Sequence, residues 1–144
     1  MRAFKPVLIS MISASITLIA SNVQAQSLYT HNITNADATC IINDGFCSTD
    51  ILHEKGITHP GAVNETSRES LLRACIGNKT DCKADIYMTN NCDKTGASKI
   101  ATVKFDVLNE GFKSVEMFDN NYKIEGQGFD LFISGGSAKI KNLG

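Results

Sequence analysis

Alternating apolar and polar residues dominate the second half of the chain and predict β-strands there. In residues 101–107 every second side chain is apolar, and the side chains between them are polar or charged. The same two-residue period occupies residues 84–88 and 114–117 and continues through residues 122–133. Such a period places successive side chains on opposite faces of a sheet. Short polar turns separate these runs, and short links cannot make parallel crossovers, so we expect an antiparallel meander.

A helical period precedes the strands. Residues 67–76 follow a capping-box pattern, in which the Thr66 hydroxyl and the Glu69 carboxylate each satisfy a backbone donor, and Gly77 supplies a stop. The apolar positions of this segment share one helical face: Leu71, Leu72, Cys75 and Ile76. One apolar face of the sheet must be covered, so the sheet either curls into a small barrel or sandwich or packs against this helix. The predicted fold class is therefore β-rich α+β, a meander curled into a small sandwich or partly open barrel with one packed N-terminal helix.

The remaining segments give weaker patterns. Residues 26–39 are polar without a sustained period, which predicts an extended arm or an edge strand. We expect a short helix at residues 51–55, a loop at 57–64 and a last short strand at 138–141. The pair Gly126 and Gly128, within an otherwise alternating run, suggests a bulge or sharp bend.

The N-terminus has the form of a secretory signal peptide. Arg2 and Lys5 precede an uncharged apolar run, and residues 21–25 end in a small-x-small cleavage pattern. We expect residues 1–25 to be removed and residues 26–144 to form a single exported domain, periplasmic or extracellular, with no transmembrane segment after cleavage. The boundary favours a bacterial source. Without Arg2 and Lys5 the chain keeps 12 basic against 15 acidic residues, a net charge of −3 that does not favour nucleic acid as a partner.

All five cysteines lie in the exported part, where thiols are oxidised: Cys40, Cys47, Cys75, Cys82 and Cys92. A tight turn centred on Asn43 and Asp44 would set Cys40 opposite Cys47 at disulfide distance, so this pair is the favoured local bridge. For the other three, a bond from Cys75 to Cys82 or Cys92 would join the helix to the sheet. We favour Cys75–Cys92 with Cys82 free, and Cys82–Cys92 is the alternative. The odd count leaves one thiol unpaired, which offers a route to a disulfide-linked dimer.

No convergent catalytic set is visible. His53, Glu54 and His59 resemble a zinc-protease pattern only superficially, because the second histidine comes two residues too late for one helical turn. Neither a metal site nor a cofactor site is expected, and we lean against an enzyme. Most aromatic residues fall on the inward phase of their strands, but Phe132 lies on the opposite phase and is a candidate contact residue.

These patterns favour an exported, disulfide-stabilised binding or structural module whose ligand, a protein or a glycan, the sequence does not identify. An envelope component, an adhesin-like domain, an inhibitor and a secreted effector all fit this description. One alternative is a small secreted hydrolase with its site around His53 and His59. A second alternative is a surface subunit that assembles through an exposed strand edge or the unpaired cysteine.

Overall fold

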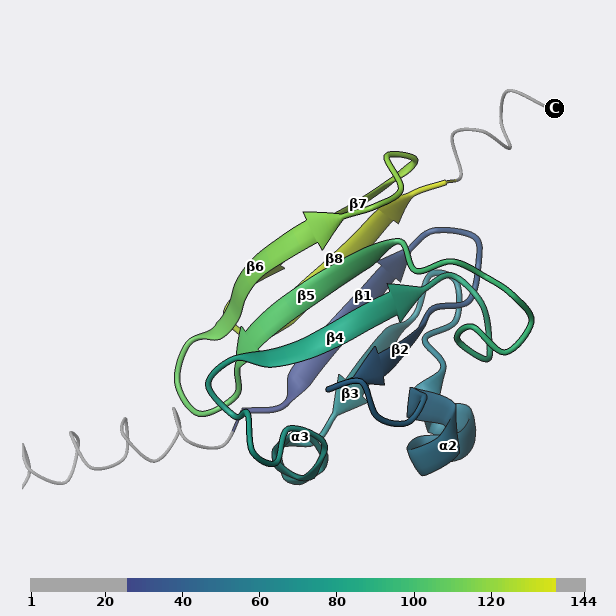
Figure 1. Cartoon of the computed structure of the whole chain (residues 1–144). Coiled ribbons are helices and arrows are strands. Elements are labelled where there is room, and N and C mark those ends of the chain that lie inside the picture. Colours follow the sequence, from purple (N-terminus) through teal and green to yellow (C-terminus); the bar gives the residue numbers. More distant parts are fainter. Residues whose placement is uncertain (1–25, 137–144) are drawn as a thin grey trace, which may run out of the picture.

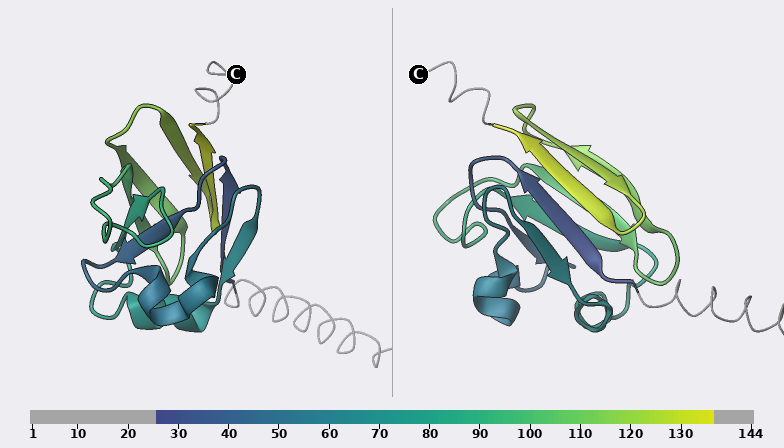
Figure 2. Two further views of the ribbon diagram at one scale, coloured as in Figure 1. Left: turned by 90° about the vertical axis from the view of Figure 1, so that its right-hand side faces the viewer. Right: turned by 180° about the vertical axis from the view of Figure 1, so that it is seen from behind.

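The computed structural model describes residues 26–136, which form two facing four-stranded sheets (Figures 1 and 2). The first sheet has the strand order β3-β1-β8-β7, and the second has the order β2-β4-β5-β6. The strands are β1 (Leu28–Ile33), β2 (Thr39–Ile42), β3 (Val63–Thr66), β4 (Cys82–Tyr87), β5 (Ala101–Asp106), β6 (Gly111–Met117), β7 (Tyr122–Gln127) and β8 (Asp130–Gly135). The β-rich, antiparallel-dominated fold class is confirmed. The expected signal peptide, residues 1–25, and the strand expected at 138–141 lie outside the described residues.

The strands predicted from alternation are present in the second half of the chain. Strands β4, β5 and β6 pair as consecutive antiparallel neighbours, and β7 pairs with β8 in the other sheet. The run 122–133 is divided at Gly128, whose φ of +58° belongs to the turn between β7 and β8. The core between the sheets contains the inward residues of these strands, among them Val103, Leu131 and Ile133.

The N-terminal segment differs from the expectation of an arm or edge strand. Strand β1 lies inside its sheet, antiparallel to β3 and parallel to β8. Its sequence looks polar because one of its buried positions is occupied by Asn32, whose side chain is hydrogen-bonded inside the protein. The Asn32 side chain donates to the Ala36 and Thr58 carbonyls at 2.7 and 2.8 Å and accepts from the Thr34 hydroxyl at 2.6 Å. A buried amide satisfied in this way costs little, and it fixes the loops on either side.

The helices begin at different residues from those expected. Helix α3 (Arg68–Ala74) is capped by Ser67, whose hydroxyl accepts from the Ser70 amide, because Thr66 still belongs to β3. Strand β3 begins at Val63, inside the segment 57–64 that was expected to be a loop. Helix α2 (Ser48–Leu52) begins three residues before the expected start and continues into the 3₁₀-helix η1 (His53–Gly56). Leu71 of α3 and Cys75, directly after it, are buried as the apolar face predicts, but Ile76 of the same expected face is exposed.

Both favoured disulfide assignments, Cys40–Cys47 and Cys75–Cys92, are wrong, although one of the two bonds considered for joining the helix to the sheet, Cys75–Cys82, is present. The bonds are Cys47–Cys92 and Cys75–Cys82, and Cys40 is the free cysteine. The turn at Asn43 and Asp44 exists, with φ of +56° at both residues. The residue that pairs with Cys47 in a backbone β-bridge is, however, Ile41 and not Cys40. A shift of one residue moves a side chain to the other face of a strand. Cys40 therefore faces the core, while Cys47 lies with Ile41, Tyr87 and Cys92 in a separate cluster.

We predict that the two bonds contribute unequally to stability. Cys47–Cys92 spans 45 residues and Cys75–Cys82 spans 7, and the entropy lost by the unfolded chain grows with loop length. Replacing Cys47 and Cys92 together by Ala should lower the free energy of unfolding by about 4 kcal/mol, against about 2 kcal/mol for Cys75 and Cys82. Urea denaturation of both double variants measures the two losses. A larger loss from the shorter loop would contradict this account.

Candidate functional site

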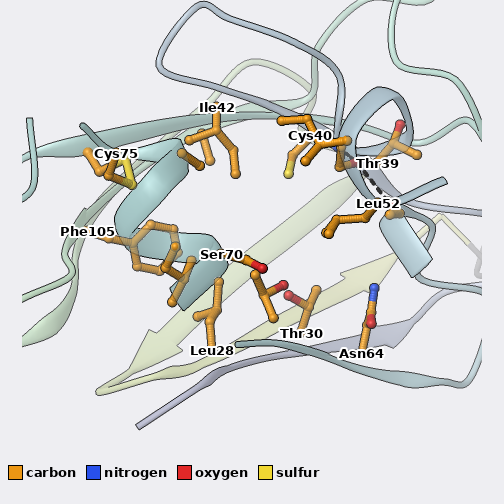
Figure 3. A pocket seen from close by; sticks show the side chains of 18 of the residues that line it. Leu28, Thr30, Thr39, Cys40, Ile42, Leu52, Asn64, Ser70, Cys75 and Phe105 are labelled. Carbon is orange, nitrogen blue, oxygen red and sulfur yellow. Dashed lines mark hydrogen bonds between the residues drawn. A yellow bond between two sulfur atoms is a disulfide. The ribbon is translucent and has the colours of Figure 1, made fainter. Parts of the chain in front are cut away.

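The main feature between the sheets is a pocket of about 550 Å³ that opens between the edge strands β2 and β3. Figure 3 shows Cys40 and Ile42 of β2 above the cavity, Leu28 and Thr30 of β1 below it, and α3 beside it. The two helical segments, α2 with η1 and α3, flank the opening (Figures 1 and 3). The pocket is therefore open at one pair of sheet edges.

The inner surface of the pocket is apolar because the strands alternate. Leu131 and Ile133 of β8 face Ile86 of β4 and Phe105 of β5 across the cavity, and all four are buried. Nearer the opening the inward positions of β1 and β3 carry Thr30, Asn64 and Thr66, which are half-buried. The pocket thus has an apolar interior and a rim that can hydrogen-bond.

The walls at the opening are tied to the sheets. Cys75, at the end of α3, is bonded to Cys82, the first residue of β4. On the other side the Ser48 hydroxyl donates to the Gly56 carbonyl at 2.7 Å, which closes α2 and η1 into one compact unit. The Asn64 side chain donates to the Lys55 carbonyl at 2.8 Å and joins η1 to β3. These contacts hold the opening in place before any ligand enters.

The free cysteine lines this pocket. Burial raises the pKa of the Cys40 thiol to about 11; a side-chain hydrogen bond with Ser48 opposes the shift, and the charge of Asp85 adds to it. A thiol with so high a pKa is a poor nucleophile and a poor partner in disulfide exchange. Dimer formation through the unpaired cysteine stays a prediction, and it would require the pocket edges to admit a second thiol.

The two histidines singled out in the sequence do not line the pocket. His59 lies half-exposed between two carboxylates, with Nδ1 at 2.8 Å from Asp37 and Nε2 at 2.7 Å from Glu54. Both ring nitrogens are occupied, so neither can take a proton from water or from a nucleophile in this arrangement. His53 is exposed at the end of α2, and Asp81 pairs with Lys104 and Lys113 elsewhere.

Phe132 lies on the outer face of its sheet, half-buried. Its ring stacks on His31 at a centroid distance of 4.3 Å, and His31 also contacts Asp130 at 3.0 Å. Helix α3 does not cover it, because α3 lies on the opposite, pocket-lining side of the sheet. The role of Phe132 as a contact residue stays a prediction.

Comparison with known proteins identifies a family and a solved structure of similar fold. A family model described as "T2SS substrate NttC" matches residues 3–142. The chain belongs to this family. A crystal structure of the Legionella pneumophila type II secretion system substrate NttC superposes with a TM-score of 0.59 at 18% identity, covering 76% of this chain and 97% of that chain. At that identity the likeness supports the fold alone. No curated protein matches the chain.

Membership of the NttC family decides one prediction. Its members are described as type II secretion substrates, so the expected export is confirmed, and membership of this family implies passage through the periplasm to the extracellular space. In residues 26–136 no helix is long and apolar enough to cross a membrane.

Nothing in the sequence pattern pointed to the pocket, because its lining residues come from both sheets and both helices. The inward phases of the strands could have identified most of its apolar residues, but not that space remains between them.

We predict that Cys40 is slow to alkylate in the folded protein. A pKa of about 11 in place of 9.0 lowers the thiolate population at pH 8 about a hundredfold. Iodoacetamide labelling followed by mass spectrometry should therefore be at least that much slower in buffer than in urea without reductant. The Cys40→Ser variant should take up no label in either condition. Equal labelling rates in buffer and in urea would show that the Cys40 thiol is exposed to water in the folded protein.

We predict a pH-dependent contribution from His59. Hydrogen bonds to Asp37 and Glu54 raise the pKa of His59 above its ordinary value of 6.5. The folded state therefore binds the proton more tightly than the unfolded state, and its stabilisation is complete below pH 6.5 and lost as pH rises through the raised pKa. The melting temperature of the unsubstituted protein minus that of His59→Asn should grow as pH falls from 9 to 6. His53→Asn is the control. A melting-temperature difference for His59→Asn that shrinks as pH falls would contradict stabilisation by the hydrogen bonds of His59 to Asp37 and Glu54.

Proposed function

We propose that the protein is a secreted, non-catalytic binding module that takes small apolar ligands in the pocket between its sheets. The observation that carries this proposal is the 550 Å³ cavity, whose interior is formed by buried aliphatic and aromatic side chains. Its size lies within the range of small-molecule sites, about 300–1,000 Å³. Such sites combine an apolar lining with a few polar groups, as found here at the rim.

The hydrolase alternative has less support. His59 and Glu54 do meet, but at the surface and with Asp37 on the second ring nitrogen. The free thiol of Cys40 is weakly acidic, and it lines a pocket from which both histidines are absent. Binding without catalysis therefore accounts for more of the structure.

A fluorescent apolar probe tests the proposal. The chain contains no tryptophan, so the emission of N-phenyl-1-naphthylamine, a neutral probe, can be followed without interference. We expect saturable binding at one site per chain. Thr30→Phe and Ser70→Phe, which each add a ring at the pocket lining, should weaken binding at least about tenfold, since a ring excludes the probe from the volume it needs.

Thr95→Phe is the matched control. Thr95 lies in the exposed loop between β4 and β5 and does not line the pocket. Circular dichroism establishes that each variant is folded, and the two pocket variants on different elements guard against failure of one to fold. No saturable binding, or equal binding by Thr30→Phe, Ser70→Phe and Thr95→Phe, would overturn the proposal.

A further inference from the structure

The pocket is divided into an apolar interior and a polar rim, and this division concerns the ligand class of the binding site proposed above. Residues of the interior such as Leu131 and Ile133 expose almost nothing to solvent. At the rim, the hydroxyls of Thr30 and Ser70 point towards the space between the sheets in Figure 3. The Ser70 hydroxyl accepts a hydrogen bond from the Ser67 hydroxyl at 3.0 Å, which leaves its own hydrogen for a ligand. A ligand that fits both zones has an apolar part and a hydrogen-bonding end.

The charges around the pocket have one sign. Its charged lining residues are Lys55 and Arg73, and no aspartate or glutamate of the described chain lines it. Arg73 is paired with Glu69 on the exposed side of α3. Lys55 forms no ion pair within residues 26–136, although its backbone is fixed to β3 through Asn64. A lysine without a carboxylate partner at the opening of an apolar pocket is suited to an anionic end group.

Exposed apolar side chains surround the same opening. Phe46, Ile51 and Ile76 all line the pocket, yet they are 71%, 55% and 70% exposed. Large apolar side chains gathered in this way mark contact sites. Here they extend the apolar interior outwards on the side of α2 and α3, so an apolar chain that enters the pocket remains in contact with protein along its length.

We propose that the pocket binds a single-chain amphiphile with an anionic headgroup, a carboxylate or a phosphate. The acyl or alkyl chain lies between the sheets against Leu131 and Ile133. The headgroup lies at the opening, where Lys55 supplies the charge and the hydroxyls of Thr30 and Ser70 supply hydrogen bonds. This inference rests on the proposed function, and it adds the class of ligand and the orientation in which the ligand enters.

Competition against N-phenyl-1-naphthylamine separates the two claims. The competitors are dodecanoate, dodecanol and dodecyltrimethylammonium, which share one chain and differ in charge, each below its micelle-forming concentration. We expect dodecanoate to bind more tightly than dodecanol by about two- to fivefold, the range for a partly exposed ion pair, and dodecyltrimethylammonium to bind most weakly. Across decanoate, dodecanoate and tetradecanoate, affinity should rise about fourfold per methylene until the pocket is filled.

Lys55→Gln tests the headgroup assignment. It should remove the advantage of dodecanoate over dodecanol and leave the affinity for dodecanol unchanged. Lys123→Gln is the matched control, because Lys123 is an exposed lysine of β7 outside the pocket lining, and it should leave the order of the three ligands unaltered. Raising the salt concentration should reduce the dodecanoate advantage in the unsubstituted protein and in Lys123→Gln, and should have no effect on the ratio in Lys55→Gln.

Each outcome points to one claim. Equal affinity for dodecanoate and dodecanol, or an unchanged preference in Lys55→Gln, overturns the anionic headgroup while leaving an apolar binding module. Failure of all three ligands and of the probe overturns the proposed function itself. A lysophosphatidylglycerol competitor distinguishes the sources of the anion, since tighter binding than dodecanoate indicates a lipid phosphate and weaker binding indicates a free carboxylate; either result supports the proposed class.

Discussion

The close contact between β6 and β7 is the constraint on which the rest of the structure depends. A side-chain carbon on Gly126 would lie 2.2 Å from the ring of Phe112, and one on Gly111 would lie 2.1 Å from the Gly128 carbonyl oxygen. Gly111 also has a φ of +81°, which other residues rarely adopt. Glycine at these positions lets the Phe112 amide donate to the Gly128 carbonyl at 2.7 Å and brings the two sheets together along this edge.

Because the sheets meet at β6 and β7, their other edges are left to be covered by something else. Strands β2 and β3 do not pair with each other, and α2, η1 and α3 occupy the margins of the opening. A sandwich closed on both sides would have filled this volume with side chains. Here short elements stand at the margins, fixed by Cys75–Cys82 and by the hydrogen bond from Ser48 to Gly56. The pocket is thus a consequence of unequal closure of the two sheet edges.

Local periodicity predicted the parts of the fold that depend on one strand at a time. The strands from Cys82 onwards and the inward position of Cys75 follow from alternation and from the helical face. The interior position of β1 could not be predicted, since Asn32 is buried through hydrogen bonds to loops distant in the sequence, which a residue pattern does not contain. The disulfides were missed because a single-residue shift, Ile41 in place of Cys40 opposite Cys47, changes which face a cysteine occupies. The pocket, likewise, depends on how two sheets meet.

The same shift explains how an odd number of cysteines is accommodated in an oxidising compartment. Cys47 and Cys92 lie with Ile41 and Tyr87, while Cys40, one residue before Ile41, packs against the core between the sheets. Exchange with the Cys47–Cys92 bond would require the Cys40 sulfur to cross strand β2, and burial already disfavours its thiolate. The sheet itself therefore protects the bond that spans the longer loop. It also leaves a small polarizable side chain in the pocket lining.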